Sequence, residues 1–106
     1  MKSTCKDITA QIKSAIQAID PRAEVHLFGS RARGDSKIDS DWDILVLVEK
    51  NVDRLQDQEP YRRAILGVMT RTDELISTIV RNKQQWNTFH RDEPLFKEIE
   101  EEGILL

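Results

Sequence analysis

Asp41 and Asp43 open an apolar run that is typical of a β-strand over residues 43–48. Side chains alternate along a strand, so we expect both carboxylates on one face, with Cα atoms roughly 6.5–7 Å apart. Two carboxylates at this spacing repel each other unless a cation lies between them. Hard cations that take oxygen ligands suit that gap, Mg²⁺ above all, with Mn²⁺ as the alternative. The pair therefore predicts a divalent-metal site.

A second candidate feature lies just upstream, in residues 27–34 (LFGSRARG). Gly29 and Ser30 follow an apolar strand expected over 24–28, and a sharp turn there leaves backbone N–H groups free for a phosphate. Glycine lets the backbone approach a ligand closely, and the serine hydroxyl can donate to a phosphate oxygen. Metal carboxylates beside such a turn are typical of phosphoryl or nucleotidyl transfer.

The spacing of these motifs resembles the signature of the nucleotidyltransferase superfamily that includes DNA polymerase β. Ten residues separate Gly29-Ser30 from the Asp-x-Asp at 41–43, as in the family pattern. The closer resemblance is to the minimal nucleotidyltransferase domains of bacteria and archaea, which share Phe-Gly-Ser-Arg-Ala-Arg-Gly and a length near 100 residues. Segments 85–86 (QW), 94–96 (PLF) and 102–105 (EGIL) are also similar to a bacterial subgroup of these proteins, so the resemblance spans nearly the whole chain.

The resemblance implies roles for individual residues. Asp41 and Asp43 would hold Mg²⁺, and Gly29 and Ser30 would contact the nucleotide phosphates. Arg31 and Arg33 both flank the turn, where a guanidinium can bind phosphate oxygens through two hydrogen bonds. Arg33 is expected to contact the triphosphate, because the family pattern favours a basic residue before the second glycine.

One position departs from the family pattern. Active members usually carry a third carboxylate on the next strand, where it completes the metal site and acts as general base. Aligning residues 74–80 with that strand places Ser77 at this position, and serine is a poor base and a weak Mg²⁺ ligand. Asp73 would share the face of Ser77 by strand parity, which requires the strand to begin earlier.

Three functions remain open at this point. The first is Mg²⁺-dependent transfer of a nucleoside monophosphate from an NTP, with ATP expected, to an acceptor hydroxyl. The resemblance implies an acceptor on a partner protein of the HEPN class, as in toxin–antitoxin modules. The second is a catalytically weak or inactive module that binds nucleotide or partner, which Ser77 favours. The third is an antibiotic-modifying nucleotidyltransferase, which the absence of a second lobe disfavours.

Composition limits the wider setting. The chain has 106 residues and a net charge of −3, which argues against a general nucleic-acid coat. No run of about 20 apolar residues or signal-peptide pattern is present, so no membrane segment is expected. The single Cys5 cannot form an internal disulfide, and a cytoplasmic location is expected.

The elements that must position these residues follow from the apolar periodicity and the turn residues. Helices are expected over 3–19, 53–71 with a break at Pro60, 83–87 and 94–102, and strands over 24–28, 43–48 and 74–80. Ser30 is expected to cap a short helical turn at 31–33 that Gly34 ends, and Trp42 is expected to pack in the core. Together these elements predict one α/β (α+β) domain over 1–106, with a small mixed sheet, helices packed mainly on one side and a nucleotidyltransferase core.

Overall fold

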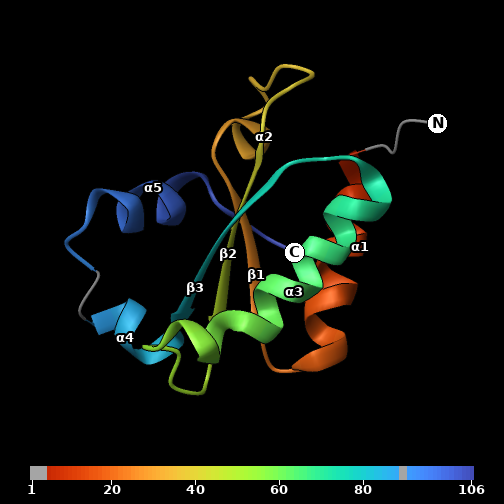
Figure 1. The fold of residues 1–106 in the computed structure, drawn as a ribbon. Coiled ribbons are helices and arrows are strands. Elements are labelled where there is room, and N and C mark those ends of the chain that lie inside the picture. The colour runs from red at the N-terminus through yellow and green to blue at the C-terminus, as the bar shows by residue number, and fades with distance from the viewer. Residues whose placement is uncertain (1–4, 89–90) are drawn as a thin grey trace.

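A computed structural model describes residues 5–88 and 91–106. Its elements along the chain are α1 (Cys5–Ile19), β1 (Glu24–Phe28), α2 (Ser30–Arg33), β2 (Trp42–Val48), α3 (Leu55–Thr72), β3 (Ile76–Asn82), α4 (Lys83–Thr88), α5 (Pro94–Glu102) and β4 (Ile104–Leu105). Figure 1 shows that the strands form a twisted sheet with helices on both sides.

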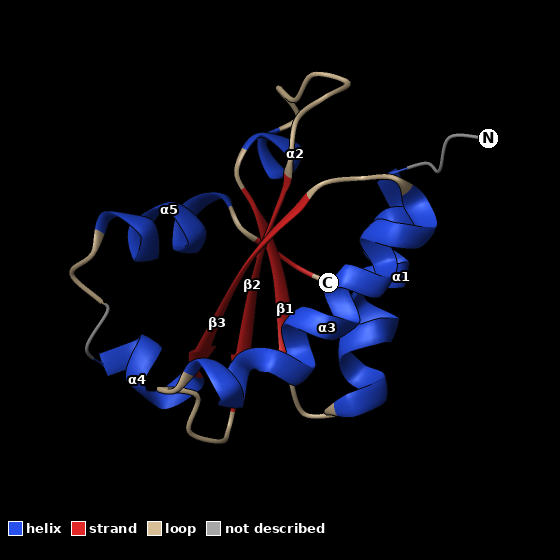
Figure 2. Cartoon of the chain, in the orientation of Figure 1, coloured by secondary structure: helices blue, strands red, loops and turns tan. Residues whose placement is uncertain are grey.

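The sheet is mixed and has the strand order β3-β2-β1-β4. β1 pairs antiparallel with β2 on one side and with β4 on the other, while β2 and β3 run parallel. The parallel pair requires a crossover, and α3 supplies it (Figure 2). The predicted small mixed α/β sheet is therefore confirmed.

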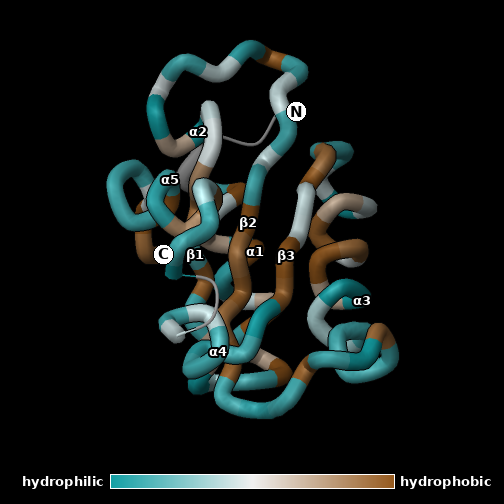
Figure 3. The backbone as a smooth tube through the Cα atoms, turned by 90° about the vertical axis from the view of Figure 1, so that its left-hand side faces the viewer, coloured by the Kyte–Doolittle hydropathy of each residue, from teal (hydrophilic) through white to brown (hydrophobic). Residues whose placement is uncertain are grey.

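The central strand β2 is buried on both faces, which explains its nearly continuous apolar sequence. Its alternate residues Ile44, Val46 and Val48 pack in a core with α1 and α3. Leu45 and Leu47 pack on the opposite face with α4 and α5. The tube in Figure 3 is accordingly brown along most of β2 and mostly teal between α2 and β2. The two long helices thus cover one face, and two short helices cover the other (Figure 1).

Three details differ from the sequence-based expectation. Pro60 lies inside a continuous α3 and does not break it; as the sixth residue of the helix it removes one backbone hydrogen bond near the N-terminal end. β3 begins at Ile76, since Asp73 ends α3 with a left-handed φ of 58° and the chain extends only after it. The two-residue strand β4 was not expected, because a segment this short has no readable periodicity.

No helix within residues 5–88 and 91–106 is both long enough and apolar enough to cross a membrane.

A partly buried hydrogen bond fastens α3 to the turn after α1. The Tyr61 side chain is fully buried, and its hydroxyl donates to the carboxylate of Asp20 at 2.7 Å. Burial and this carboxylate raise the pKa of Tyr61, so the hydroxyl stays protonated.

We predict that Tyr61→Phe lowers the free energy of unfolding by about 1 kcal/mol, the usual worth of one such bond. Urea denaturation measures the change. In a double-mutant cycle with Asp20→Asn, the two effects should be non-additive, and strict additivity would show that the bond contributes nothing.

Candidate functional site

The turn between β1 and α2 is built on Gly29. Its φ of 75° and ψ of −159° lie in a region that side chains disfavour. Its carbonyl accepts hydrogen bonds from the N–H groups of Ala32 and Arg33, both at 3.1 Å. Gly29 is thus the N-cap of α2 and Ser30 its first residue, so the expectation that Ser30 caps the turn was wrong. Gly34 ends α2 as expected, with a left-handed conformation.

Gly29 also lies directly against a candidate metal ligand. β1 and β2 pair so that Phe28 is opposite Asp43. A Cβ atom added at Gly29 would lie 2.2 Å from Oδ2 of Asp43, well inside van der Waals contact. The missing side chain therefore lets the backbone turn and the carboxylate of β2 touch.

The two aspartates occupy different environments. Asp43 is half-buried in β2, whereas Asp41 is exposed in the residue before the strand. Burial is the largest factor that raises the pKa of Asp43, followed by the negative charges of Asp41 and Glu98, and Arg33 opposes the rise. A cation between these carboxylates would relieve the repulsion, so their donor chemistry suits a divalent metal. In the parts of the chain that the structure describes, no group of three or more His, Cys, Asp or Glu side chains is placed to hold a metal.

Trp42 separates the two aspartates in sequence and lies in the core, as expected, with 2 % of its surface exposed. Its indole Nε1 donates to Glu74 at 3.3 Å. The Arg31 guanidinium lies over the ring, 4.5 Å from the centroid, and donates to the carbonyl of Ser40 at 2.9 Å. Arg31 therefore stabilises the loop that leads to Asp41. The contact with the Trp42 ring directs the Arg31 guanidinium toward that ring.

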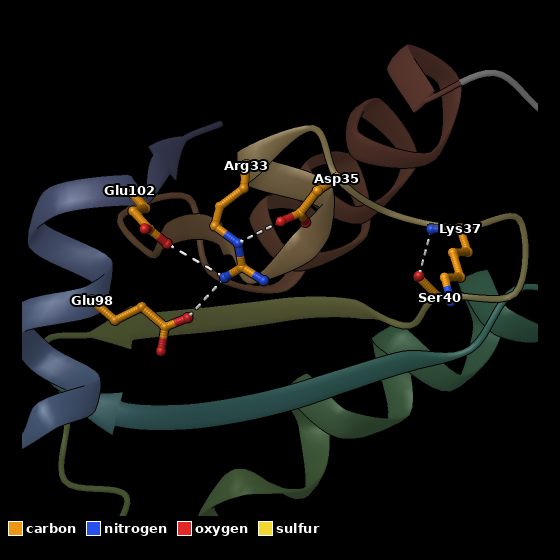
Figure 4. Close-up of polar contacts among 6 residues, drawn as sticks. All are labelled: Arg33, Asp35, Lys37, Ser40, Glu98 and Glu102. Atoms are coloured by element: carbon orange, nitrogen blue, oxygen red, sulfur yellow. Dashed lines mark hydrogen bonds and ion pairs between the residues drawn. The ribbon is translucent and has the colours of Figure 1, made fainter.

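The other arginine, Arg33, is surrounded by carboxylates (Figure 4). Its Nε lies 3.2 Å from Asp35, and its Nη1 lies 3.3 Å from Glu98 and 3.4 Å from Glu102. Hydrogen bonds to Asp35 first, and then to Glu102, raise the pKa of Arg33, so it remains fully charged. Arg33 connects α2 to α5, which are far apart in sequence.

The loop between Gly34 and Asp41 has its own internal bonds. The backbone N–H of Lys37 donates to Oγ of Ser40 at 2.8 Å (Figure 4), and the N–H of Ser40 donates back to the Lys37 carbonyl at 3.0 Å. Together with the Arg31 contact, these bonds give the segment before Asp41 a defined path.

The structure separates the two candidates for the third-strand position. Ser77 lies next to Asp43 in the parallel register of β2 and β3, and it is exposed. Asp73 is the C-cap of α3, outside the strand, so the earlier strand start that would have placed it on the face of Ser77 does not occur. The residue beside Asp43 on β3 therefore carries a hydroxyl group and not a carboxylate.

Sequence reasoning missed Glu98 and Glu102. They are four residues apart, so they lie on one face of α5. That spacing was readable, but nothing in the sequence says that this face of α5 docks beside α2.

The sequence of this chain matches the family model for the nucleotidyltransferase domain over residues 9–105. The chain belongs to this nucleotidyltransferase family. Among solved structures, it is similar to a chain in the crystal structure of a mutant of the toxin–antitoxin MntA–HpeT, with a TM-score of 0.62 and 20% identity. That similarity covers 92% of this chain and 70% of the other, and at this identity it supports the fold. No curated protein matched the sequence.

Two glycines of this nucleotidyltransferase domain provide a matched pair of variants. Both have positive φ, but a Cβ at Gly34 would meet nothing within 4 Å, whereas one at Gly29 would collide with Asp43. We predict that Gly34→Ala lowers the free energy of unfolding by about 1 kcal/mol. Gly29→Ala should lower it by about 2–3 kcal/mol, because the collision adds to the backbone strain. Thermal and urea unfolding measure both, and equal losses would mean that the close contact with Asp43 is unimportant.

The raised pKa of Asp43 predicts a pH dependence. A carboxyl whose pKa is higher in the folded protein binds its proton more tightly there, so its ionisation destabilises the fold at neutral pH. Without divalent cations, Asp43→Asn should therefore be more stable than the wild type at pH 7. The difference should shrink as the pH falls through the folded pKa toward the ordinary aspartate value. A wild type that is the more stable protein at pH 7 would contradict the prediction.

Proposed function

We propose that the protein is a divalent-metal-dependent nucleotidyltransferase, with Mg²⁺ preferred and Mn²⁺ as the alternative. It transfers a nucleoside monophosphate from an NTP, ATP being the expected nucleotide, to an acceptor hydroxyl. The observation that carries this proposal is the contact between Gly29 and Asp43. It joins a turn suited to phosphate to a carboxylate suited to a metal.

The proposed roles follow from position and charge. The backbone at Gly29 and the hydroxyl of Ser30 orient the phosphates, and Arg33 neutralises charge on the triphosphate. Asp41 and Asp43 would hold the metal, which supplies charge neutralisation in the transition state. The acceptor hydroxyl releases its proton to solvent as its oxygen forms a bond to the α-phosphorus, and the bond from that phosphorus to the pyrophosphate oxygen breaks so that pyrophosphate leaves.

We further propose that the acceptor belongs to a partner protein of the HEPN class. Two points support this. The fold is similar to that of a chain in a toxin–antitoxin pair, and the sequence resembles minimal nucleotidyltransferase domains, which act in such modules. We also propose that residues 1–106 form one such domain.

A specific observation supports a second candidate, a module that binds nucleotide or partner and transfers slowly or not at all. The residue beside Asp43 on β3 is Ser77, whose hydroxyl is a poor general base. Ser77→Asp would place a third carboxylate at this position.

The test is transfer of label from α-labelled ATP with Mg²⁺ to the protein encoded by the neighbouring gene, co-expressed with this chain. Asp41→Asn combined with Asp43→Asn should abolish both transfer and metal-dependent ATP binding. Asp39→Asn is the matched control, because it removes an exposed carboxylate of the preceding loop and should change neither.

Ser77→Asp separates the two candidates. If the wild type lacks a general base, this variant should raise the transfer rate, by as much as about 10²-fold, the lower end of the usual general-base range. Transfer by the wild type that Ser77→Asp leaves unchanged would show that β3 needs no carboxylate. ATP binding that survives loss of both aspartates would overturn the proposed site.

A further inference from the structure

The Arg33 guanidinium is shared by carboxylates from two parts of the chain. Asp35 is local, whereas Glu98 and Glu102 come from α5, 65 and 69 residues further along. Figure 4 shows the guanidinium between α2 and α5, with both glutamates pointing toward it. One positive charge thus faces three negative charges.

These ion pairs are accessible to a competing anion. The side chains of Arg33, Glu98 and Glu102 are 37%, 38% and 40% exposed. Exposed pairs of this kind are individually weak, so a ligand of higher charge density can replace them. A triphosphate is such a ligand, and its oxygens can accept bidentate hydrogen bonds from arginine, as a carboxylate can.

Glu98 has a second effect at the same place. Its negative charge reaches Asp43, where it adds to the repulsion that Asp41 already exerts. A bound triphosphate would meet this charge as well. Glu98 therefore opposes a phosphate ligand in two ways, by occupying Arg33 and by adding negative charge beside Asp43, and Glu102 opposes it by occupying Arg33.

We propose that Glu98 and Glu102 are positioning residues that hold Arg33 away from the nucleotide, and that nucleotide binding exchanges these carboxylates for phosphate oxygens. This inference rests on the proposed function, since it takes the triphosphate as the incoming ligand. The exchange loosens the polar contact between α2 and α5. Phe96 and Ile99 keep α5 on the sheet, because they pack in the core on the face of β2 that carries Leu45 and Leu47. Nucleotide affinity is thereby set in part by a helix outside the signature motif.

A thermodynamic cycle tests the exchange. Titration calorimetry with ATP and Mg²⁺ compares the wild type, Arg33→Ala, the pair Glu98→Gln with Glu102→Gln, and the triple variant. Removing both glutamates should tighten ATP binding roughly fivefold, the worth of two exposed ion pairs. Arg33→Ala should weaken it about tenfold, and in that background the glutamate changes should have less than a twofold effect.

Glu101→Gln is the matched control, because it removes an exposed charge from the same helix and should leave ATP affinity unchanged. Equal tightening with and without Arg33 would mean that the glutamates act only through their general charge, and it would overturn the exchange. Weaker ATP binding in the Glu98→Gln and Glu102→Gln pair would overturn it too, because the carboxylates would then support the ligand.

A titration with inorganic tripolyphosphate separates this inference from the proposed function. Binding is monitored by the Nε–Hε NMR signal of Arg33. A shift of that signal, with tighter binding in the glutamate pair, supports the exchange even if no nucleotide is ever transferred. Nucleotide transfer without coupling between Arg33 and the glutamates leaves the proposed function standing and overturns the exchange. Failure of both ATP and tripolyphosphate to bind the wild type and the glutamate pair overturns both.

Discussion

The close approach of Gly29 to Asp43 is the constraint on which the rest of the site depends. Antiparallel pairing places the end of β1 beside the start of β2, and any side chain at position 29 would occupy the space of the Asp43 carboxylate. The positive φ of Gly29 also turns the chain into α2, so one residue both ends the strand and opens the carboxylate to the turn. A site that combines phosphate and metal chemistry requires this proximity.

The rest of the fold makes this contact rigid. β2 is buried on both faces between two apolar cores, so Asp43 is held on a strand that has little freedom to move. On the opposite face of that strand, the contact between Trp42 and Arg31 fixes the position of the first residue of β2. This rigidity has an electrostatic cost. The half-buried carboxylate of Asp43 is held near the negative charges of Asp41 and Glu98, and the charge of Arg33 opposes them.

Much of this arrangement could be predicted from the sequence, because it is local. The Gly29-Ser30 turn, the strand that carries Asp43 and the glycine that ends α2 are each specified by neighbouring residues. Long-range docking could not be predicted. The different roles of Arg31 and Arg33 follow from contacts with Trp42 and with α5, and these depend on how distant elements pack. Strand parity could not decide the position of Asp73 for a related reason, since α3 continues through Thr72 and the extended chain begins only after its cap.

The pairing of β1 with β2 also has a consequence for folding. Their connection closes a short loop, and Gly29 and Asp43 are only fourteen positions apart, so bringing them together requires little loss of chain entropy. The parallel strand β3 and the helix α5 arrive through much longer connections, whose closure is slower. Within the candidate site, the β1–β2 pairing is therefore the contact whose formation costs the least chain entropy, whereas the β3 and α5 side chains reach the same place only by closing longer loops.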